Sequence, residues 1–91
     1  MDINLKNRKV VITGVSEGIG RSLALAFGEA GAHVAGSARN RERLSAIENE
    51  ISGTGHFFCS ADFSQSDDIQ MFHNKAISAM GGVDILINNV G

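Results

Sequence analysis

The sequence predicts an α/β fold in which helices cover both faces of a parallel β-sheet, with the element order βαβαβαβ. Four short apolar segments alternate with three longer segments whose apolar residues recur at helical spacing. Glycines follow each of the three helical segments, and the 91-residue chain has no proline to interrupt a regular element. Strands that alternate with helices in this way pair in parallel through right-handed crossovers.

The first half of the chain supplies two strands around one helix. A strand is predicted at residues 9–13, a short β-branched run that ends at Gly14. Residues 19–30 carry an apolar stripe of helical period, and Gly31 suits the positive φ that ends many helices. The second strand is predicted at residues 33–37.

The second half adds two helices and two strands. Asn40 is a suitable N-cap for a helix whose apolar stripe runs to Ile51. A strand is predicted at residues 56–61, and residues 64–67 (Ser-Gln-Ser-Asp) match a capping box for the third helix. The last predicted strand covers residues 84–88.

The turn after the first predicted strand contains Gly14, Gly18 and Gly20. A strand, a glycine turn and a helix N-terminus form an anion site, because the first helical N–H groups lack intrahelical partners. Gly14 suits a tight turn, Gly18 permits close approach of a pyrophosphate, and Gly20 permits close packing of the helix on the strand. The G-x-x-x-G-x-G spacing differs from the common dinucleotide and phosphate-loop patterns, so an ordinary turn is the alternative.

Polar residues follow each of the other predicted strands. Arg39 comes after the second strand, Asp62 after the third, and Asn88 and Asn89 close the fourth. In open parallel sheets, ligands bind outside the carboxyl ends of the strands, where the strand order reverses. We therefore interpret residues 1–91 as a dinucleotide-binding half-domain of Rossmann type, a truncated doubly wound fold.

Arg39 favours NADP over NAD as the cofactor. Many dinucleotide sites carry an acidic residue in this neighbourhood, whereas a guanidinium makes a charge-assisted contact to a 2′-phosphate. Alternatively, Arg39 belongs to the solvated start of the second helix. Glu17 opposes the NADP interpretation, because it adds negative charge to the glycine turn.

Asp62 is a candidate acceptor for the adenine amino group, and Phe63 is a candidate lining for the adenine cleft. The alternative for Asp62 is a loop residue that helps to start the next helix. Asn88 and Asn89 either tie backbone groups together or contact a ligand. The three histidines lack partners at metal-ligand spacing, so we assign no metal site.

Composition excludes several classes of function. A formal net charge of −2 gives no general attraction to nucleic acid or to an anionic membrane. A single cysteine rules out an intrachain disulfide and fits a reducing compartment. The N-terminal residues lack the apolar core of a signal peptide, and no segment is long enough to cross a bilayer, so we expect a cytoplasmic protein.

Two segments resemble the short-chain dehydrogenase/reductase family. Residues 13–20 (Thr-Gly-Val-Ser-Glu-Gly-Ile-Gly) are similar to its T-G-x-x-x-G-x-G cofactor motif. Residues 82–91 (Gly-Val-Asp-Ile-Leu-Ile-Asn-Asn-Val-Gly) are similar to its D-x-L-x-N-N-A-G segment, with Val90 in place of the usual alanine. The resemblance covers the whole chain but only the first part of a family member, and it implies a nicotinamide dinucleotide as cofactor.

The resemblance implies how the phosphate end of that cofactor is held. Loop amides around Ser16, Glu17 and Ile19 would bind the cofactor phosphates, and Arg39 would select NADP. Family members that prefer NADP often carry a basic residue at the position of Glu17. This departure keeps NAD as the alternative cofactor.

The rest of the cofactor would lie along the following strands. By the same resemblance, Asp62 and Phe63 would contact adenine, Asn89 would lie along the adenosine ribose, and the nicotinamide would reach past Gly91. The complete set of candidate cofactor-binding residues is Gly14, Ser16, Glu17, Gly18, Ile19, Gly20, Arg39, Asp62, Phe63, Asn89 and Gly91.

No catalytic residue is assigned. By the resemblance, hydride transfer between the nicotinamide and a carbonyl or alcohol substrate would use Asn, Ser and Tyr-x-x-x-Lys residues downstream of the N-N-A-G segment. The chain has no tyrosine, and Lys75 precedes the last predicted strand. We therefore expect the cofactor-binding portion of an oxidoreductase, inactive alone, with a non-catalytic dinucleotide-binding module as the alternative.

The last predicted strand presents an open edge. Residues 85–87 (Ile-Leu-Ile) would leave apolar side chains and unpaired backbone groups at the side of the sheet, which invites pairing with another chain. We expect either self-association into a homo-oligomer or a longer polypeptide.

Overall fold

The computed structural model describes residues 5–15 and 18–89 and confirms the predicted order of strands and helices. The first strand has the predicted bounds, the second and the fourth each differ from the prediction by one residue at one end, and the third is one residue shorter at both ends. The helices begin and end close to the predicted positions. The elements are β1 (Lys9–Thr13), α1 (Gly18–Glu29), β2 (His33–Ala38), α2 (Arg41–Glu50), β3 (Phe57–Ser60), α3 (Ser66–Met80) and β4 (Ile85–Asn88).

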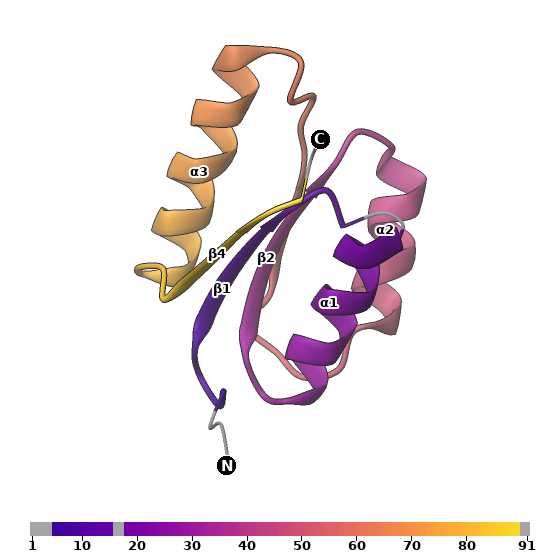
Figure 1. The fold of residues 1–91 in the computed structure, drawn as a ribbon, viewed down its shortest axis with the longest axis vertical. Helices are drawn as coiled ribbons and strands as arrows, with labels where there is room; N and C mark the ends of the chain where they lie inside the picture. The colour runs from indigo at the N-terminus through magenta and orange to yellow at the C-terminus, as the bar shows by residue number, and fades with distance from the viewer. Residues whose placement is uncertain (1–4, 16–17, 90–91) are drawn as a thin grey trace.

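The four strands form one parallel sheet in the order β3-β2-β1-β4. The chain runs outward from β1 through β2 to β3, and then crosses back to place β4 on the other side of β1 (Figure 1). The strand order therefore reverses between β1 and β4. In open parallel sheets, this reversal is where the carboxyl ends of the strands leave a crevice for a ligand.

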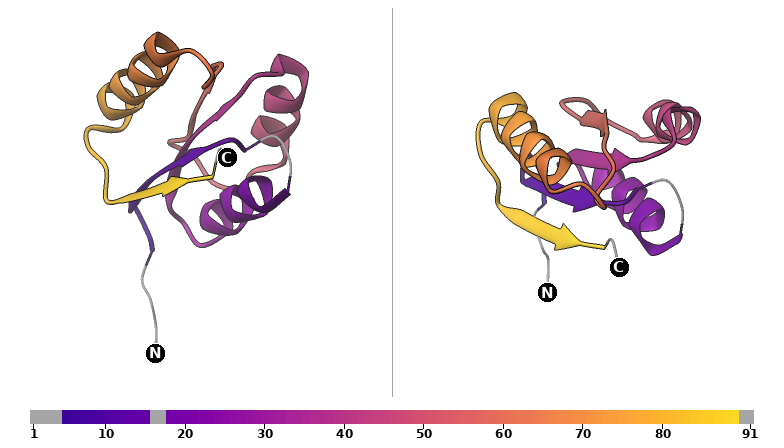
Figure 2. Two further views of the ribbon diagram at one scale, coloured as in Figure 1. Left: turned by 45° about the horizontal axis from the view of Figure 1, so that its top comes forward. Right: turned by 90° about the horizontal axis from the view of Figure 1, so that it is seen from above.

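Helices cover both faces of the sheet, as predicted. Figures 1 and 2 show α1 and α2 on one side and α3 on the other. Side chains alternate along each strand, so Val10 and Ile12 enter the core beneath α1 and α2, whereas Val11 enters the core beneath α3. On β2, Val34 and Ala35 divide between the same two cores.

Two helix termini follow the sequence-based prediction in detail. At the end of α1, Gly31 has φ +92°, and the N–H groups of Gly31 and Ala32 donate to the carbonyls of Gly28 and Phe27. This is the bonding pattern of a Schellman cap, which needs a residue of positive φ. At the start of α2, the side chain of Asn40 accepts from the second and third helical N–H groups and so acts as the predicted N-cap.

The predicted capping box at residues 64–67 is wrong. The N-cap of α3 is Gln65, which makes no side-chain cap hydrogen bond, and the helix begins at Ser66. Ser64 instead donates its N–H and its hydroxyl to Oδ1 of Asp62. The serine is held by the aspartate two residues before it, because Asp side chains form local turns of this kind in competition with helix caps.

Candidate functional site

The glycine turn lies at the carboxyl end of β1, beside the point where the strand order reverses. Gly14 has φ +74° and Gly18 has φ +62°, backbone conformations that side-chain-bearing residues rarely adopt. The chain can therefore reverse tightly from β1 into α1. Among the candidate binding residues, Ser16, Glu17 and Gly91 lie outside the described residues.

Gly20 brings the first turn of α1 against the turn that precedes it. A Cβ atom at this position would overlap the carbonyl oxygen of Gly14 and the side-chain nitrogen of Asn89. Because no side chain separates them, helix, turn and the end of β4 meet directly. The role predicted for Gly20, close packing of the helix, agrees with this contact.

Hydrogen bonds join the end of β1 to the end of β4. The hydroxyl of Thr13 donates to Oδ1 of Asn88 (3.1 Å) and accepts from the backbone N–H of Asn89 (2.9 Å). Nδ2 of Asn89 donates to the carbonyl oxygen of Gly14 (2.9 Å). Asn89 therefore ties backbone groups together, as one of the two interpretations of these amides predicted. Its contact with a cofactor stays a prediction.

The glycine turn is also bonded to β2, through a residue that sequence reasoning missed. The N–H of Gly14 donates to Oγ of Ser37 (3.3 Å), and the N–H of Val15 donates to the carbonyl oxygen of Ser37 (2.8 Å). Ser37 is 1% exposed. Its signal in the sequence is a hydroxyl in a strand that is apolar apart from His33 at its start, which by itself does not distinguish a packed hydroxyl from a functional one.

The N-terminus of α1 supplies the positive end of a helix at this site. Helices leave their first N–H groups without intrahelical partners, and the helix dipole adds partial positive charge there. Gly18 and Ile19 are exposed, and Ile19 retains 72% of its accessible surface. This end of the helix is therefore open to an anionic ligand such as a phosphate.

Arg39 and Asp62 meet at the carboxyl ends of β2 and β3. Nε of Arg39 lies 3.9 Å from Oδ1 of Asp62, and the Arg39 side chain is 78% exposed. An ion pair of this length between solvent-exposed groups contributes little to stability. The guanidinium is therefore accessible to a ligand, although a carboxylate beside it competes with a phosphate for its charge.

Asp62 has a local structural role as well. Its carboxylate accepts both hydrogen bonds from Ser64, and its own N–H donates to Oδ2 of Asp68 in the first turn of α3 (2.8 Å). The hydroxyl and then the N–H of Ser64 lower the pKa of Asp62; burial opposes them, and Arg39 adds a further lowering. The carboxylate is ionised at neutral pH and can accept a hydrogen bond from a ligand amino group.

Phe63 points into the core beneath α3. Its ring centroid is 5.6 Å from that of Phe72, which is fully buried. The same ring lines a hollow of about 150 Å³ together with Thr13, Ile69, His73, Leu86 and Asn88. The hollow lies at the carboxyl ends of β1 and β4, on the α3 side of the sheet.

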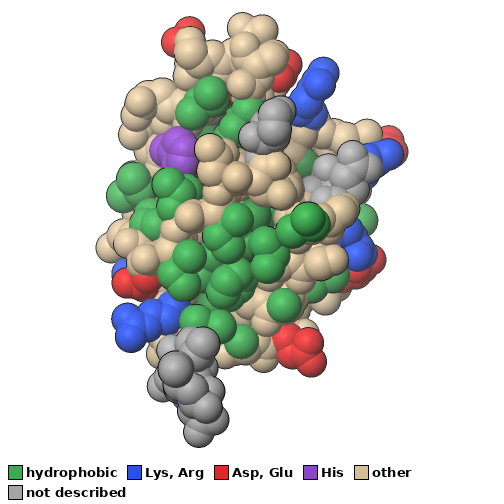
Figure 3. Space-filling view, in the orientation of Figure 1, with side chains coloured by type: hydrophobic (Ala, Val, Ile, Leu, Met, Phe, Trp, Pro, Cys, Tyr) green, Lys and Arg blue, Asp and Glu red, His purple; other side chains and the backbone are tan. Residues whose placement is uncertain are grey.

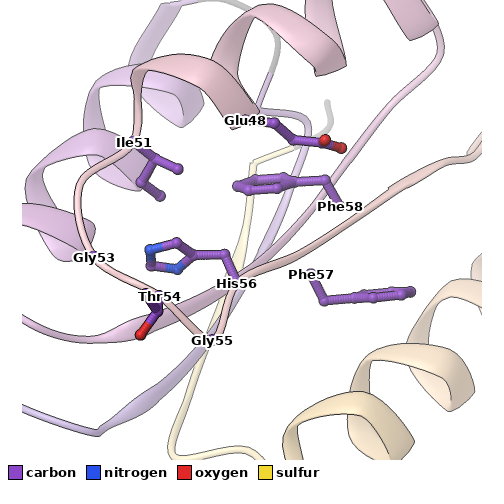
Figure 4. Close-up of a pocket in the computed structure, with 8 residues that line it drawn as sticks. All are labelled: Glu48, Ile51, Gly53, Thr54, Gly55, His56, Phe57 and Phe58. Atoms are coloured by element: carbon purple, nitrogen blue, oxygen red, sulfur yellow. The ribbon is translucent and has the colours of Figure 1, made fainter.

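A second hollow, of about 420 Å³, lies at the amino end of β3 (Figure 4). Figure 4 shows His56, Ile51 and Phe58 gathered on one side of the strand, with Phe57 turned to the other. His56 is already engaged there: Nδ1 accepts from the N–H of Val34 (3.0 Å), and Nε2 donates to the carbonyl oxygen of Ser52 (2.8 Å). This imidazole holds the connection before β3, at the opposite end of the sheet from the glycine turn.

The described residues contain no group of three or more His, Cys, Asp or Glu side chains arranged to hold a metal ion. Within the same residues, no helix is long and apolar enough to cross a membrane. Cys59 is half-buried, and its thiol lies 3.5 Å from the carbonyl oxygen of Ser60.

Comparison with known sequences identifies relatives of the chain. Residues 8–91 match the family described as short chain dehydrogenase. A glucose 1-dehydrogenase of Gluconobacter oxydans is 40% identical over 87 residues, which cover 92% of this chain and 33% of the relative. An NADPH-dependent pterin aldehyde reductase of Arabidopsis thaliana is 39% identical over 85 residues, 92% of this chain and 35% of the relative. The chain thus spans about a third of the length of these relatives.

Solved structures confirm the Rossmann-type fold. A hydroxysteroid dehydrogenase from Escherichia coli superposes with a TM-score of 0.89 at 35% identity, over 97% of this chain and 38% of that chain. A 3-ketoacyl-(acyl-carrier-protein) reductase from Brucella melitensis, complexed with NADH, superposes with a TM-score of 0.87 at 32% identity, over 96% of this chain and 35% of that chain.

Proposed function

Since this chain belongs to the short-chain dehydrogenase family, we propose that it forms the cofactor-binding part of an NADP(H)-dependent oxidoreductase. The reaction is hydride transfer between the nicotinamide and a carbonyl or alcohol substrate. The nicotinamide carries that chemistry, and this part of the protein binds and orients the cofactor. The 91 residues contain no tyrosine to act as acid or base, so we propose that they do not catalyse the transfer alone.

The observation that carries this proposal is the junction of β1, α1 and β4. An exposed helix N-terminus follows a glycine turn of positive φ, and Asn89 at the end of β4 bonds to that turn. The junction supports binding of a pyrophosphate at the start of α1, with the adenosine toward β2 and β3. The candidate set given above, from Gly14 to Gly91, stays our proposed binding set.

Arg39 supports NADP as the cofactor. Its exposed guanidinium follows β2 directly and can make two charge-assisted hydrogen bonds to a 2′-phosphate. The negative charges of Asp62 beside it and of Glu17 in the glycine turn disfavour a 2′-phosphate and so favour NAD. The relatives include an NADPH-dependent enzyme and a structure complexed with NADH, so they are compatible with either cofactor.

Calorimetric titration of the chain with NADPH and with NADH tests the proposed cofactor. We expect tighter binding of NADPH, and Arg39→Ala is expected to weaken NADPH binding about tenfold while leaving NADH binding nearly unchanged. Arg41→Ala, an exposed arginine on the first turn of α2, is the matched control and keeps the wild-type preference. Tighter binding of NADH, or equal losses for both nucleotides in Arg39→Ala, would contradict the NADP assignment.

A non-catalytic dinucleotide-binding module is the second candidate, favoured by the absence of tyrosine from the sequence. The coding sequence beyond these residues separates the two candidates. A serine followed by Tyr-x-x-x-Lys supports the enzyme, and a stop codon directly after Gly91 supports the module.

We also propose that the free side of β4 is covered in solution, either by a second copy or by further residues of a longer polypeptide. β4 pairs with β1 alone among the described strands, and Leu86 on it is 57% exposed. The proposed compartment is the cytoplasm, where the thiol of Cys59 stays reduced.

A further inference from the structure

The glycine turn is fixed to β2 by two hydrogen bonds that end on one residue. Ser37 accepts the N–H of Gly14 with its hydroxyl and the N–H of Val15 with its carbonyl. Because Ser37 is 1% exposed, water does not compete with these bonds. The two N–H groups are therefore already used within the protein, and any phosphate must be held by N–H groups later in the turn or at the start of α1.

A packing contact on the same strand adds to these bonds. The side chain of Val15 is fully buried and rests over Gly36, the residue before Ser37. A Cβ atom on Gly36 would lie 2.8 Å from both methyl carbons of Val15 and 2.9 Å from Cε1 of Phe58. The absent side chain at Gly36 is what lets Val15 and the glycine turn sit this close to β2.

The same strand leads directly to the candidate selector of the cofactor. Arg39 follows Ser37 by two residues, so the position of the glycine turn and the position of the guanidinium are both set by the end of β2. In a dinucleotide, the pyrophosphate and the 2′ position belong to the same adenosine ribose, so the distance between them can vary only over a few rotatable bonds. A turn that shifted relative to β2 would satisfy only one of these two contacts at a time.

We propose that Gly36 and Ser37 are positioning residues that set the distance between the pyrophosphate-binding end of α1 and the 2′-binding residue Arg39. They touch no ligand themselves and act through Gly14 and Val15. This inference rests on the proposed dinucleotide-binding function and deepens it.

Two substitutions test the proposal by different physical routes. Ser37→Ala removes the hydroxyl acceptor, and Gly36→Ala adds a methyl group under Val15. The probes are ADP-ribose, which contains the pyrophosphate, and adenosine 2′-monophosphate, which lacks it. Each variant is expected to bind ADP-ribose about fivefold more weakly and adenosine 2′-monophosphate with little change. Ser37→Thr, which keeps a hydroxyl, is expected to bind ADP-ribose more tightly than Ser37→Ala.

Val34→Ala is the control for a loss of stability alone. Val34 is fully buried on the same strand, but it makes neither of the hydrogen bonds that join Gly14 and Val15 to Ser37. It is expected to lower the unfolding temperature and to leave the ratio of the two affinities unchanged. Equal losses for both probes in Ser37→Ala and Gly36→Ala, or the same change of ratio in Val34→Ala, would overturn the proposal.

Hydrogen exchange of the Gly14 amide, measured without ligand, separates this inference from the proposed function. We expect slower exchange in the wild-type chain than in Ser37→Ala. Equal exchange rates overturn the positioning role even where dinucleotides bind. If exchange is slower in the wild-type chain but ADP-ribose does not bind, the hydrogen bonds from the glycine turn to Ser37 are present and the proposed dinucleotide binding is wrong. The positioning role is then wrong as well.

Discussion

Asp62 illustrates how one side chain at the sheet edge combines a structural bond with a candidate binding role. Both hydrogen bonds from Ser64 and the contact with Arg39 end on Oδ1 of this carboxylate. These partners favour the ionised form, which is why the pKa of Asp62 is lowered despite the opposing effect of burial. The ionised form is also the one that accepts a hydrogen bond from an adenine amino group.

Acid titration tests this account of Asp62. A lowered pKa in the folded chain means that the carboxylate contributes stability above about pH 4, and that this contribution is lost as the pH falls through the lowered value. We expect Ser64→Ala to raise the pKa of Asp62, measured from the ¹³C shift of its carboxyl carbon by NMR. Ser66→Ala, on the first turn of α3, is the control. An unchanged titration curve for Asp62 in Ser64→Ala would refute the assigned cause.

The limits of sequence-based prediction at this scale follow from side-chain competition. Asn40 was predictable as a cap because it directly precedes a helix and has no competing partner. Ser64 was not, because the sequence does not say whether its hydroxyl bonds forward to the helix or back to Asp62. The hydroxyl of Ser37 was equally unreadable, since its partner Gly14 lies 23 residues away in the chain.

At the scale of elements, the candidate site depends on how closely α1 approaches β1 and β4. The contact is made at Gly20, whose missing side chain leaves room for the carbonyl of Gly14 and the amide of Asn89. The amide of Asn89 then completes the connection between the glycine turn and the end of β4. The spacing of the glycines therefore reflects a packing requirement in addition to the proposed binding function.

Gly20→Ala is expected to destabilise the chain although alanine is the better helix former. The gain in helix propensity is about 1 kcal/mol, but the new Cβ overlaps backbone atoms of Gly14 and forces the turn to move. We expect a net loss of roughly 1–3 kcal/mol in the free energy of unfolding by urea denaturation, together with weaker dinucleotide binding. Ser22→Ala, at an exposed position of α1, controls for propensity. A Gly20→Ala chain as stable as Ser22→Ala would contradict this reading of the contact.

The strands and helices could be predicted because the spacing of apolar residues within each short segment indicates its type, and glycines or polar residues follow each segment. At the starts of β3 and β4, the residue that was predicted to open the strand uses its side chain to bond a neighbouring strand. His56 was predicted within β3, but its imidazole accepts the N–H of Val34 from the neighbouring strand. Asp84 was predicted within β4, but its carboxylate accepts the N–H of Lys9 at the start of β1 (2.9 Å).

At the scale of the whole molecule, β4 is an edge strand of the sheet and pairs with β1 alone among the described strands. Figure 3 shows apolar side chains gathered over the centre of the face in view, where β4 runs in Figure 1. Ile85 and Ile87 pack partly against the core beneath α1 and α2, whereas Leu86 lies on the α3 side of the sheet and is 57% exposed. An edge strand with apolar side chains and free backbone groups is a template for pairing.

Sedimentation velocity over a range of concentrations tests the proposed covering of this edge. We expect the average mass of the chain to rise above that of a monomer as concentration increases. Leu86→Lys is expected to shift the distribution toward the monomer, because a charged side chain on an edge strand opposes pairing. Lys75→Ala, an exposed change on α3, is the control. A single monomeric species at every concentration would contradict self-association.

The central claim, that a nicotinamide dinucleotide binds at the glycine turn, is tested most directly by an NMR titration of the ¹⁵N-labelled chain with NADPH. We predict saturable shifts of the amides of Gly18, Ile19, Arg39 and Asn89, at the carboxyl edge of the sheet. The chemical shift of the Thr54 amide, in the connection before β3 at the opposite end of the sheet, is predicted to stay unchanged. The claim would be contradicted if no amide shift saturates, or if only amides at the end of the sheet near Thr54 shift.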